Sequence, residues 1–169
     1  MSNIFVPIDY SPLRQAVPPG EDIIYSTLCQ ASRTRGNMNT KWICHVLMTT
    51  GGVAFTFPGK KKKDPPQLLY KSWTSCNRLT SKRKNISMHV GEIYFYLVRN
   101  ANESKKAFKA RVKNFVPQVR PYLVQKQEAW LRENANNPNI KRRGYRWVSK
   151  VYNRMVKREE KRLKKEAKS

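Results

Sequence analysis

The sequence predicts an α+β fold, in which antiparallel β-strands come first and helices follow. Two patterns support this class: apolar and polar residues alternate between residues 22 and 100, and apolar residues recur every three or four positions after Ala101. The chain has 169 residues, close to the commonest size of one domain. We therefore expect one compact domain with appendages, and a large multidomain enzyme is excluded.

The first twenty residues contain four prolines and end in Pro-Pro-Gly, which predicts an extended arm. A strand is predicted over 22–32. A second strand over 41–50 is rich in β-branched and aromatic residues, and the glycines at 51–52 supply a hairpin turn to a third strand over 53–58. The inward set of the first strand is either Ile24, Ser26 and Leu28 or Ile23, Tyr25, Thr27 and Cys29.

Residues 59–66, GKKKKDPP, predict a solvent-exposed loop because four lysines and two prolines cannot pack in a core. A fourth strand is predicted over 67–79 and a basic turn over 80–85. Two further strands, 86–90 and 92–100, are separated by a single glycine and are expected to pair.

An amphipathic helix is predicted after the last strand, with Asn102 or Ser104 as its N-cap. Pro117 and Pro121 predict a break or kink near 116–121, because proline disrupts a helix interior. The apolar stripe of this helix consists of Phe108, Val112, Phe115, Val119 and Tyr122 or Leu123.

A linker over 134–139 separates this helix from a basic C-terminal helix, whose last turns from Lys157 are nearly all charged and are expected to fray. One face of the basic helix carries Tyr145, Val148, Val151 or Tyr152, Met155 and Val156. The predicted organisation is a proline-rich arm (1–20), a domain with its capping helix (21–136) and a basic C-terminal helix (137–169).

The chain is strongly basic, with 35 Lys and Arg against 11 Asp and Glu and a net charge of +24. The excess is present both in residues 1–137 and in residues 138–169. A compact state holds such a charge against self-repulsion, so the expected partner is a polyanion.

Three widely spaced cysteines, Cys29, Cys44 and Cys76, lie in apolar or strand-like stretches, which favours reduced, buried thiols in an intracellular protein. With two histidines and no Cys-X-X-Cys pair, we expect no metal site. No stretch has the length of a membrane span, and the N-terminus lacks the features of a signal peptide. The expected location is cytoplasmic, or peripheral on the cytoplasmic face of a membrane.

The chain contains no nucleophile, zinc-protease or nucleotide-binding motif, and its acidic residues form no close pair. His45 and His89 are interpreted as ordinary strand residues, since a catalytic histidine needs partners. We therefore expect a protein that is not an enzyme and that requires no cofactor.

Basic residues gather in the predicted turns. In a meander, the loops after the first and third strands share one end of the sheet, so their cations should converge there as a site for phosphate. These candidate anion- and lipid-binding residues are Arg33, Arg35, Lys41, Lys60, Lys61, Lys62 and Lys63. A secondary basic surface, partly at the opposite end and partly in the C-terminal segment, comprises Lys82, Arg83, Lys84, Lys141, Arg142, Arg143, Arg146, Lys150 and Arg154.

The order of segments EDIIYSTLC, KWICHVLMTTGGVAFTF, QLLYKSWTSC and GEIYFYLVR, followed by AFKARVKNFV, resembles the pleckstrin-homology (PH-like) superfold in its shorter GRAM-type form, over about residues 21–125. The resemblance implies a bent, partly open antiparallel barrel that a C-terminal helix closes at one end. Many relatives bind phosphoinositides or other anionic lipids through the first hairpin and the connection after the third strand. In this sequence Arg33 and Arg35 precede the first loop and Lys41 follows it, so the family's closely spaced Lys-Xn-Arg-X-Arg arrangement is absent.

The resemblance and the charge together predict a non-catalytic module that binds anionic membrane lipids through basic loops and the basic helix. A nucleic-acid-binding protein is an alternative, because a basic helix and a charge of +24 suit a phosphate backbone equally well. A protein–protein adaptor is a third alternative, which requires an exposed apolar patch.

Overall fold

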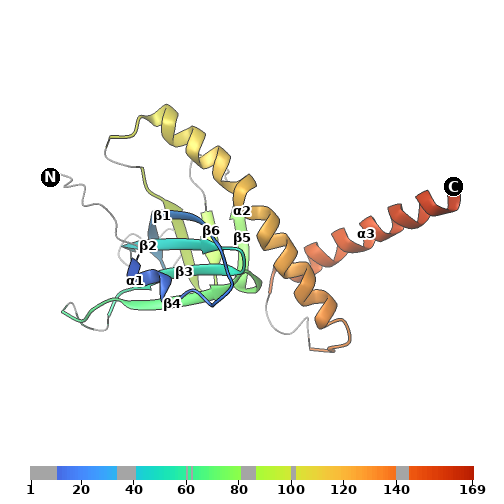
Figure 1. The fold of residues 1–169 in the computed structure, drawn as a ribbon, viewed down its shortest axis with the longest axis horizontal. Helices are drawn as coiled ribbons and strands as arrows, with labels where there is room; N and C mark the ends of the chain where they lie inside the picture. Colours follow the sequence, from blue (N-terminus) through green and yellow to red (C-terminus); the bar gives the residue numbers. More distant parts are fainter. Residues whose placement is uncertain are drawn as a thin grey trace.

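The computed structural model describes residues 11–33, 41–59, 61, 63–80, 87–99, 102–139 and 145–169, with the side chains of 11, 41 and 87 not described. Seven antiparallel strands form one sheet in the order β4-β3-β2-β1-β7-β6-β5, and the helices follow them in the chain (Figure 1). The strands are β1 (Ile23–Ser32), β2 (Lys41–Thr49), β3 (Gly52–Phe57), β4 (Gln67–Ser72), β5 (Cys76–Thr80), β6 (Ser87–Val90) and β7 (Ile93–Leu97). The predicted α+β class is confirmed.

The predicted single strand over 67–79 is wrong. The segment divides into β4, the 3-10 turn η2 (Trp73–Ser75) and β5, because Trp73 turns into the core, where it is fully buried. Its indole nitrogen donates a hydrogen bond to the Thr49 carbonyl at 3.0 Å. Since β4 and β5 are the two edges of the sheet, this three-residue link requires the sheet to curl until its edges approach each other.

The residues of β1 that face the core belong to the second of the two predicted sets, Ile23, Tyr25, Thr27 and Cys29. Thr27 and Cys29 are buried, and Tyr25 packs edge-to-face on Phe115 with ring centroids 4.7 Å apart. Ile23 is excluded from the core because a register irregularity follows it. Alternation alone leaves the two faces equivalent, and only the helix packed on one of them distinguishes them.

The two predicted hairpins are present. β2 pairs with β3 and β6 pairs with β7, and Gly91 in the second turn has a φ of +60° that favours glycine. At the first turn, a Cβ on Gly52 would collide with the carbonyl oxygen of Lys71, so the close approach of β4 requires glycine.

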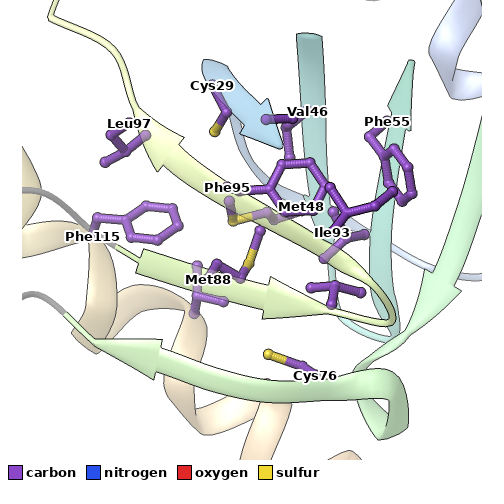
Figure 2. Close-up of a cluster of buried hydrophobic side chains, with 14 of the residues drawn as sticks. Cys29, Val46, Met48, Phe55, Cys76, Met88, Ile93, Phe95, Leu97 and Phe115 are labelled. Carbon is purple, nitrogen blue, oxygen red and sulfur yellow. The ribbon is translucent and has the colours of Figure 1, made fainter. Parts of the chain in front are cut away.

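The main core lies inside the curled sheet and beneath the first long helix, α2 (Lys105–Glu133). Figure 2 shows side chains from β1, β2, β3, β5, β6 and β7 in this interior, with Phe115 of α2 at one side of them, near Leu97 and Met88. Phe55 and Phe95 meet edge-to-face across it, with centroids 5.2 Å apart. Burial of this apolar surface is the main stabilising term of the fold.

A short helix, α1 (Ser11–Arg14), packs on the outer face of the sheet. Leu13 is buried against Leu47 and Ala54. The prediction of an extended arm is therefore wrong for residues 11–14, because a leucine can be buried there on a second apolar face of the sheet. The rest of the predicted arm before residue 11 lies outside the described residues.

Of the break or kink predicted near 116–121, the break is wrong, since α2 is continuous over 29 residues. Pro117 and Pro121 lie four residues apart on its exposed face, while Val116 and Val119 are buried on either side. Because the prolines lie on the exposed face, the carbonyls that lose their donor are open to water, and the buried residues hold both halves against the sheet. Ser104 is the N-cap, accepting a hydrogen bond from the Ala107 amide at 3.1 Å.

The last helix, α3 (Trp147–Lys168), packs against the end of α2 through a second apolar cluster and then projects away from the sheet (Figure 1). Trp147, Val148 and Val151 are buried, whereas Tyr152 and Val156, which the predicted stripe also included, are exposed. The contact with α2 covers only the first turns of one face. From Lys157 onward the helix is exposed, and it remains helical to Lys168.

Candidate anion-binding surfaces

The first candidate site lies at the end of the sheet where β1 leads to β2 and β3 leads to β4. The pairs Ser32–Lys41 and Phe57–Gln67 are partners in the ladders, so all four strand ends meet there. Arg33, Lys61 and Lys63 are exposed at this end. We call these three cations, with the strand ends around them, the strand-end surface.

Aromatic packing holds part of this surface in place. The Arg33 guanidinium lies 4.7 Å from the centroid of the Phe57 ring, and Phe57 packs edge-to-face on Trp42. The Trp42 indole donates to the Thr56 carbonyl at 3.4 Å. Arg33, on the connection between β1 and β2, thus lies against Phe57, the last residue of β3 before the connection to β4.

The other predicted residues of this group cannot be placed. Arg35, Lys60, Lys62 and the side chain of Lys41 lie outside the described residues. Whether they bind an anion remains a prediction.

Apolar side chains are also exposed on the strands of this surface. Ile43 on β2 is 57% exposed and Leu68 on β4 is 37% exposed, and Thr56 on β3 is the ladder partner of Leu68. Ile43 and Lys61 line the same hollow of about 320 Å³. Asp64 also lines it, and its carboxylate accepts a hydrogen bond from the Lys61 amide at 3.0 Å. The surface therefore combines exposed apolar groups with positive charge.

The second candidate site is a groove of about 530 Å³ between β5, α2 and α3, which we call the helix groove. Its cations come from all three elements: Arg78 from β5, Arg120 from α2, and Arg146, Lys150 and Arg154 from α3 and the residue before it. None of the described residues that line it is acidic. Such a groove concentrates positive potential between low-dielectric walls.

Hydrogen bonds position the walls of the helix groove. Arg120 donates to the Leu79 carbonyl at 2.8 Å, which joins α2 to β5. The Arg146 amide donates to the Asn77 side chain at 3.1 Å, and the Trp147 indole donates to the Thr74 carbonyl at 2.8 Å. The start of α3 is thus fixed against η2 and β5.

Behind the groove, α2 and α3 are joined around one buried carboxylate. The Glu128 side chain is 7% exposed, and Arg158 forms two hydrogen bonds with it at 3.0 and 3.1 Å. Arg132 and Arg154 lie at 3.5 and 3.7 Å from its oxygens. One negative charge is therefore shared among three positive charges.

His89 lies beside this groove on β6, opposite Arg78 in the ladder and stacked on Tyr94 with centroids 4.1 Å apart. Burial lowers the pKa of His89 below its usual value, and the positive charges of Arg146 and Arg78 lower it further. The histidine thus responds to the potential of the groove.

Of the predicted secondary surface, Arg146, Lys150 and Arg154 lie in the helix groove. Lys82, Arg83, Lys84, Lys141, Arg142 and Arg143 lie outside the described residues. Arg78 and Arg120 were missed, because each stands alone in the sequence and only the tertiary structure places it beside α3. The four-residue spacing of Arg146, Lys150 and Arg154 was a usable signal, since it places them on one helix face.

The three cysteines are free and buried, as predicted. Burial raises the pKa of Cys44 and of Cys76 to about 12 and that of Cys29 well above its usual value. Thiols in this state are poor nucleophiles, so they belong to the core and not to a reactive site.

Among the described residues, no helix combines the length and the apolar character that crossing a membrane requires. This finding does not distinguish the two candidate anion-binding surfaces.

No family model matches the chain, and a search of curated proteins found no match. Among solved structures, similarity was found to the N-terminally truncated linker-DH/PH domains of p115-RhoGEF, with a TM-score of 0.40 and 11% identity over 67% of this chain and 32% of that chain. A mutant form of the DH/PH domains of p115-RhoGEF gave a TM-score of 0.38 and 14% identity over 68% of this chain and 37% of that chain. This chain thus spans about a third of the length of these structures. The curled sheet, with its strand order β4-β3-β2-β1-β7-β6-β5 and the α2 helix after the last strand, fits a PH-like fold.

Proposed function

We propose that this chain is a non-catalytic module that binds a phosphate-bearing anionic lipid surface through the strand-end surface. The observation that supports the proposal is that exposed Ile43 lines the same hollow as Lys61, with exposed Leu68 on β4 next to Thr56 of that hollow. We further propose that residues 21–136 form the binding domain, that 1–20 and 137–169 are appendages, and that the protein acts at the cytoplasmic face of a membrane.

The two kinds of group act together at a membrane. Each Lys or Arg near an anionic leaflet contributes on the order of 1 kcal/mol. An apolar side chain that leaves water for the acyl boundary contributes about 25 cal/mol per Å² of its buried area. A few of each suffice for reversible peripheral attachment.

The projecting part of α3 supplies a second contact in this proposal. Tyr152, Val156 and Leu163 are exposed, and their spacing of four and seven residues places them on one face of the helix. Arg158 and Arg162 lie beside this face, together with Glu159. A basic amphipathic helix of this kind lies along a headgroup layer.

The test is co-sedimentation with vesicles of phosphatidylcholine alone and of phosphatidylcholine with phosphatidylserine. We expect the chain to bind only the anionic vesicles, and the double variant Lys61→Glu/Lys63→Glu to bind them at least about tenfold more weakly, since two charges are reversed. Replacing Ile43 and Leu68 by serine should weaken binding at high salt, where the electrostatic attraction is screened.

The matched control reverses Lys105 and Lys109, which are exposed on the first turns of α2. Arg111 ties this part of α2 to Val98 and Tyr25, near the other end of β1, so the control lies away from the strand-end surface. An equal loss of binding to anionic vesicles in the Lys61/Lys63 variant and in the Lys105/Lys109 variant would contradict a localised lipid site. Displacement from vesicles by a small molar amount of RNA would favour the nucleic-acid alternative.

A further inference from the structure

The helix groove takes no part in the lipid contact proposed above, because it lies at the β5 edge of the sheet and not at the strand ends of β1 to β4. It needs an explanation of its own. Five cations from three separate elements line one groove.

The groove has an excess of hydrogen-bond donors. The Nε and Nη2 atoms of Arg154 are buried and have no hydrogen-bond partner among the described residues. The approach of Nε to Glu128 is long, at 3.7 Å. Buried donors without an acceptor destabilise a protein, so binding of an acceptor within reach of these atoms is favoured.

The protein itself does not balance the charge. Glu128 is the carboxylate that Arg154 faces, and Arg158 already occupies both of its oxygens. The cations on the opposite wall, Arg78 and Arg120, have no carboxylate beside them in the lining. An incoming anion therefore meets uncompensated positive charge on both walls.

The dimensions favour a compact ligand. A volume of about 530 Å³ lies in the range of small-molecule sites. Four of the five cations are arginines, whose planar forks match phosphate oxygens in pairs. A single carboxylate would leave most of these donors unused, whereas a ligand with two or three phosphate groups reaches both walls.

We propose that the helix groove binds a compact ligand with several phosphate groups, which joins α3 to β5 and α2. The ligand is either a soluble polyphosphate compound or the phosphorylated headgroup of a lipid. In both cases its binding fixes the orientation of the projecting helix relative to the sheet.

The first experiment is isothermal titration of the full chain with inorganic tripolyphosphate at physiological salt. The groove variant is Arg78→Gln/Arg146→Gln/Lys150→Gln, three exposed positions whose side chains line the groove. The control variant is Lys157→Gln/Lys161→Gln/Lys164→Gln, which removes the same charge from the projecting part of α3. We expect saturable binding that the groove variant weakens at least about tenfold and the control less than about threefold.

A second readout uses the unaltered protein, so it holds even if the groove variant is unstable. The chain has only two histidines, so the His89 ring can be followed by NMR. Neutralising Arg146 and Arg78 with a bound anion should raise the pKa of His89 toward its usual value. An unchanged His89 titration at saturating tripolyphosphate, or equal weakening in both triple variants, would overturn the proposal.

Binding to vesicles distinguishes a soluble polyphosphate ligand from a phosphorylated lipid headgroup. If the ligand is a headgroup, vesicles that contain phosphatidylinositol bisphosphate bind the chain more tightly than phosphatidylserine vesicles of equal charge, and the groove variant loses this difference. If the ligand is soluble, the groove variant loses tripolyphosphate binding alone. The strand-end variant should retain tripolyphosphate binding, so failure of the lipid proposal and failure of the groove proposal give different results.

Discussion

At the scale of single residues, the curled sheet depends on a few side chains that satisfy the backbone of η2. The Gln127 side chain is buried and donates to the carbonyls of Trp73 at 3.0 Å and Cys76 at 2.9 Å. The Trp147 indole donates to the carbonyl of Thr74. Polar side chains from α2 and α3 thus provide the donors that a ladder would provide in a regular strand.

Substituting Gln127 by alanine should lower the free energy of unfolding by about 2 to 3 kcal/mol, because two buried carbonyls lose their donors and a small cavity forms. Urea denaturation followed by tryptophan fluorescence measures the change. Gln118→Ala, at an exposed position of the same helix, is the control and should change stability by less than about 0.5 kcal/mol. Similar values for the two variants would show that the Gln127 hydrogen bonds contribute little.

His89 should make stability depend on pH. Its pKa is lowered in the folded state by burial and by the positive charges of Arg146 and Arg78, so the unfolded chain takes up the proton at a higher pH than the folded one. The contribution of His89 is therefore fully present above the pKa of the unfolded histidine and is lost as the pH falls below it. We expect the unfolding midpoint of the wild type to fall more between pH 7.5 and 5.5 than that of His89→Gln. Parallel curves would contradict this assignment.

At the scale of elements, α2 connects the parts of the molecule. Its first half is anchored by Arg111, which pairs with both oxygens of Glu103 at 2.9 Å and donates to the Val98 carbonyl at 2.8 Å. Its middle covers the core, and its last turns hold α3 through Glu128 and Leu131. A break at its prolines would separate the part of α2 that is anchored by Arg111 from the part that holds α3.

Because Pro117 and Pro121 lie on the exposed face of a continuous helix, replacing both by alanine should raise the free energy of unfolding by about 1 kcal/mol or more. The stability gained from the restored helical hydrogen bonds exceeds the stability lost when the unfolded chain regains the conformational entropy that the prolines had removed. Thermal and urea denaturation measure it, with Lys113→Ala as the exposed control. A loss of stability would show that the prolines bend α2 to fit the sheet.

The attachment of α3 can be tested separately from the sheet. Trp147→Ala removes the hydrogen bond to the Thr74 carbonyl and the ring that packs on Trp130 and Tyr145. We expect the backbone amides of residues 147–155 to lose protection from hydrogen exchange, while the amides of the sheet stay protected. Tyr152→Ala, at an exposed position, should leave both unchanged. Loss of protection throughout the sheet would show instead that α3 folds together with the domain as one unit.

At the scale of the whole molecule, the net charge of +24 opposes compaction. The few carboxylates are used locally: Glu128 faces three arginines, and Glu159 and Glu166 pair with Arg162 on the projecting helix. With 35 Lys and Arg against 11 Asp and Glu, the positive charge far exceeds what the carboxylates can neutralise.

Salt should therefore stabilise this protein. We expect the thermal midpoint to rise by a few degrees between about 20 and 300 mM sodium chloride, because screening reduces self-repulsion. At equal ionic strength, sodium phosphate should raise it further if the helix groove binds phosphate groups. A midpoint independent of salt would show that the cations are too far apart to repel one another.

Much of this structure was determined by the sequence alone. The strand-rich first part of the chain, the hairpins, a helix cap at Asn102 or Ser104, the buried face of α2 and the three buried thiols all follow from alternation, spacing and turn residues, which are local properties of the chain. The cations of the first and third connections were likewise found in the sequence. Their role in binding remains a prediction.

Three features depend on contacts between residues far apart in the sequence, and only the tertiary structure decided them. The 67–79 segment divides because Trp73 has a place in the core, and α2 continues through Pro117 and Pro121 because tertiary packing holds both sides. The helix groove arises only when curling brings β5 next to α2 and α3, so that Arg78 and Arg120 meet Arg154. Local patterns specify which residues are apolar or charged, whereas their proximity is a property of the closed sheet.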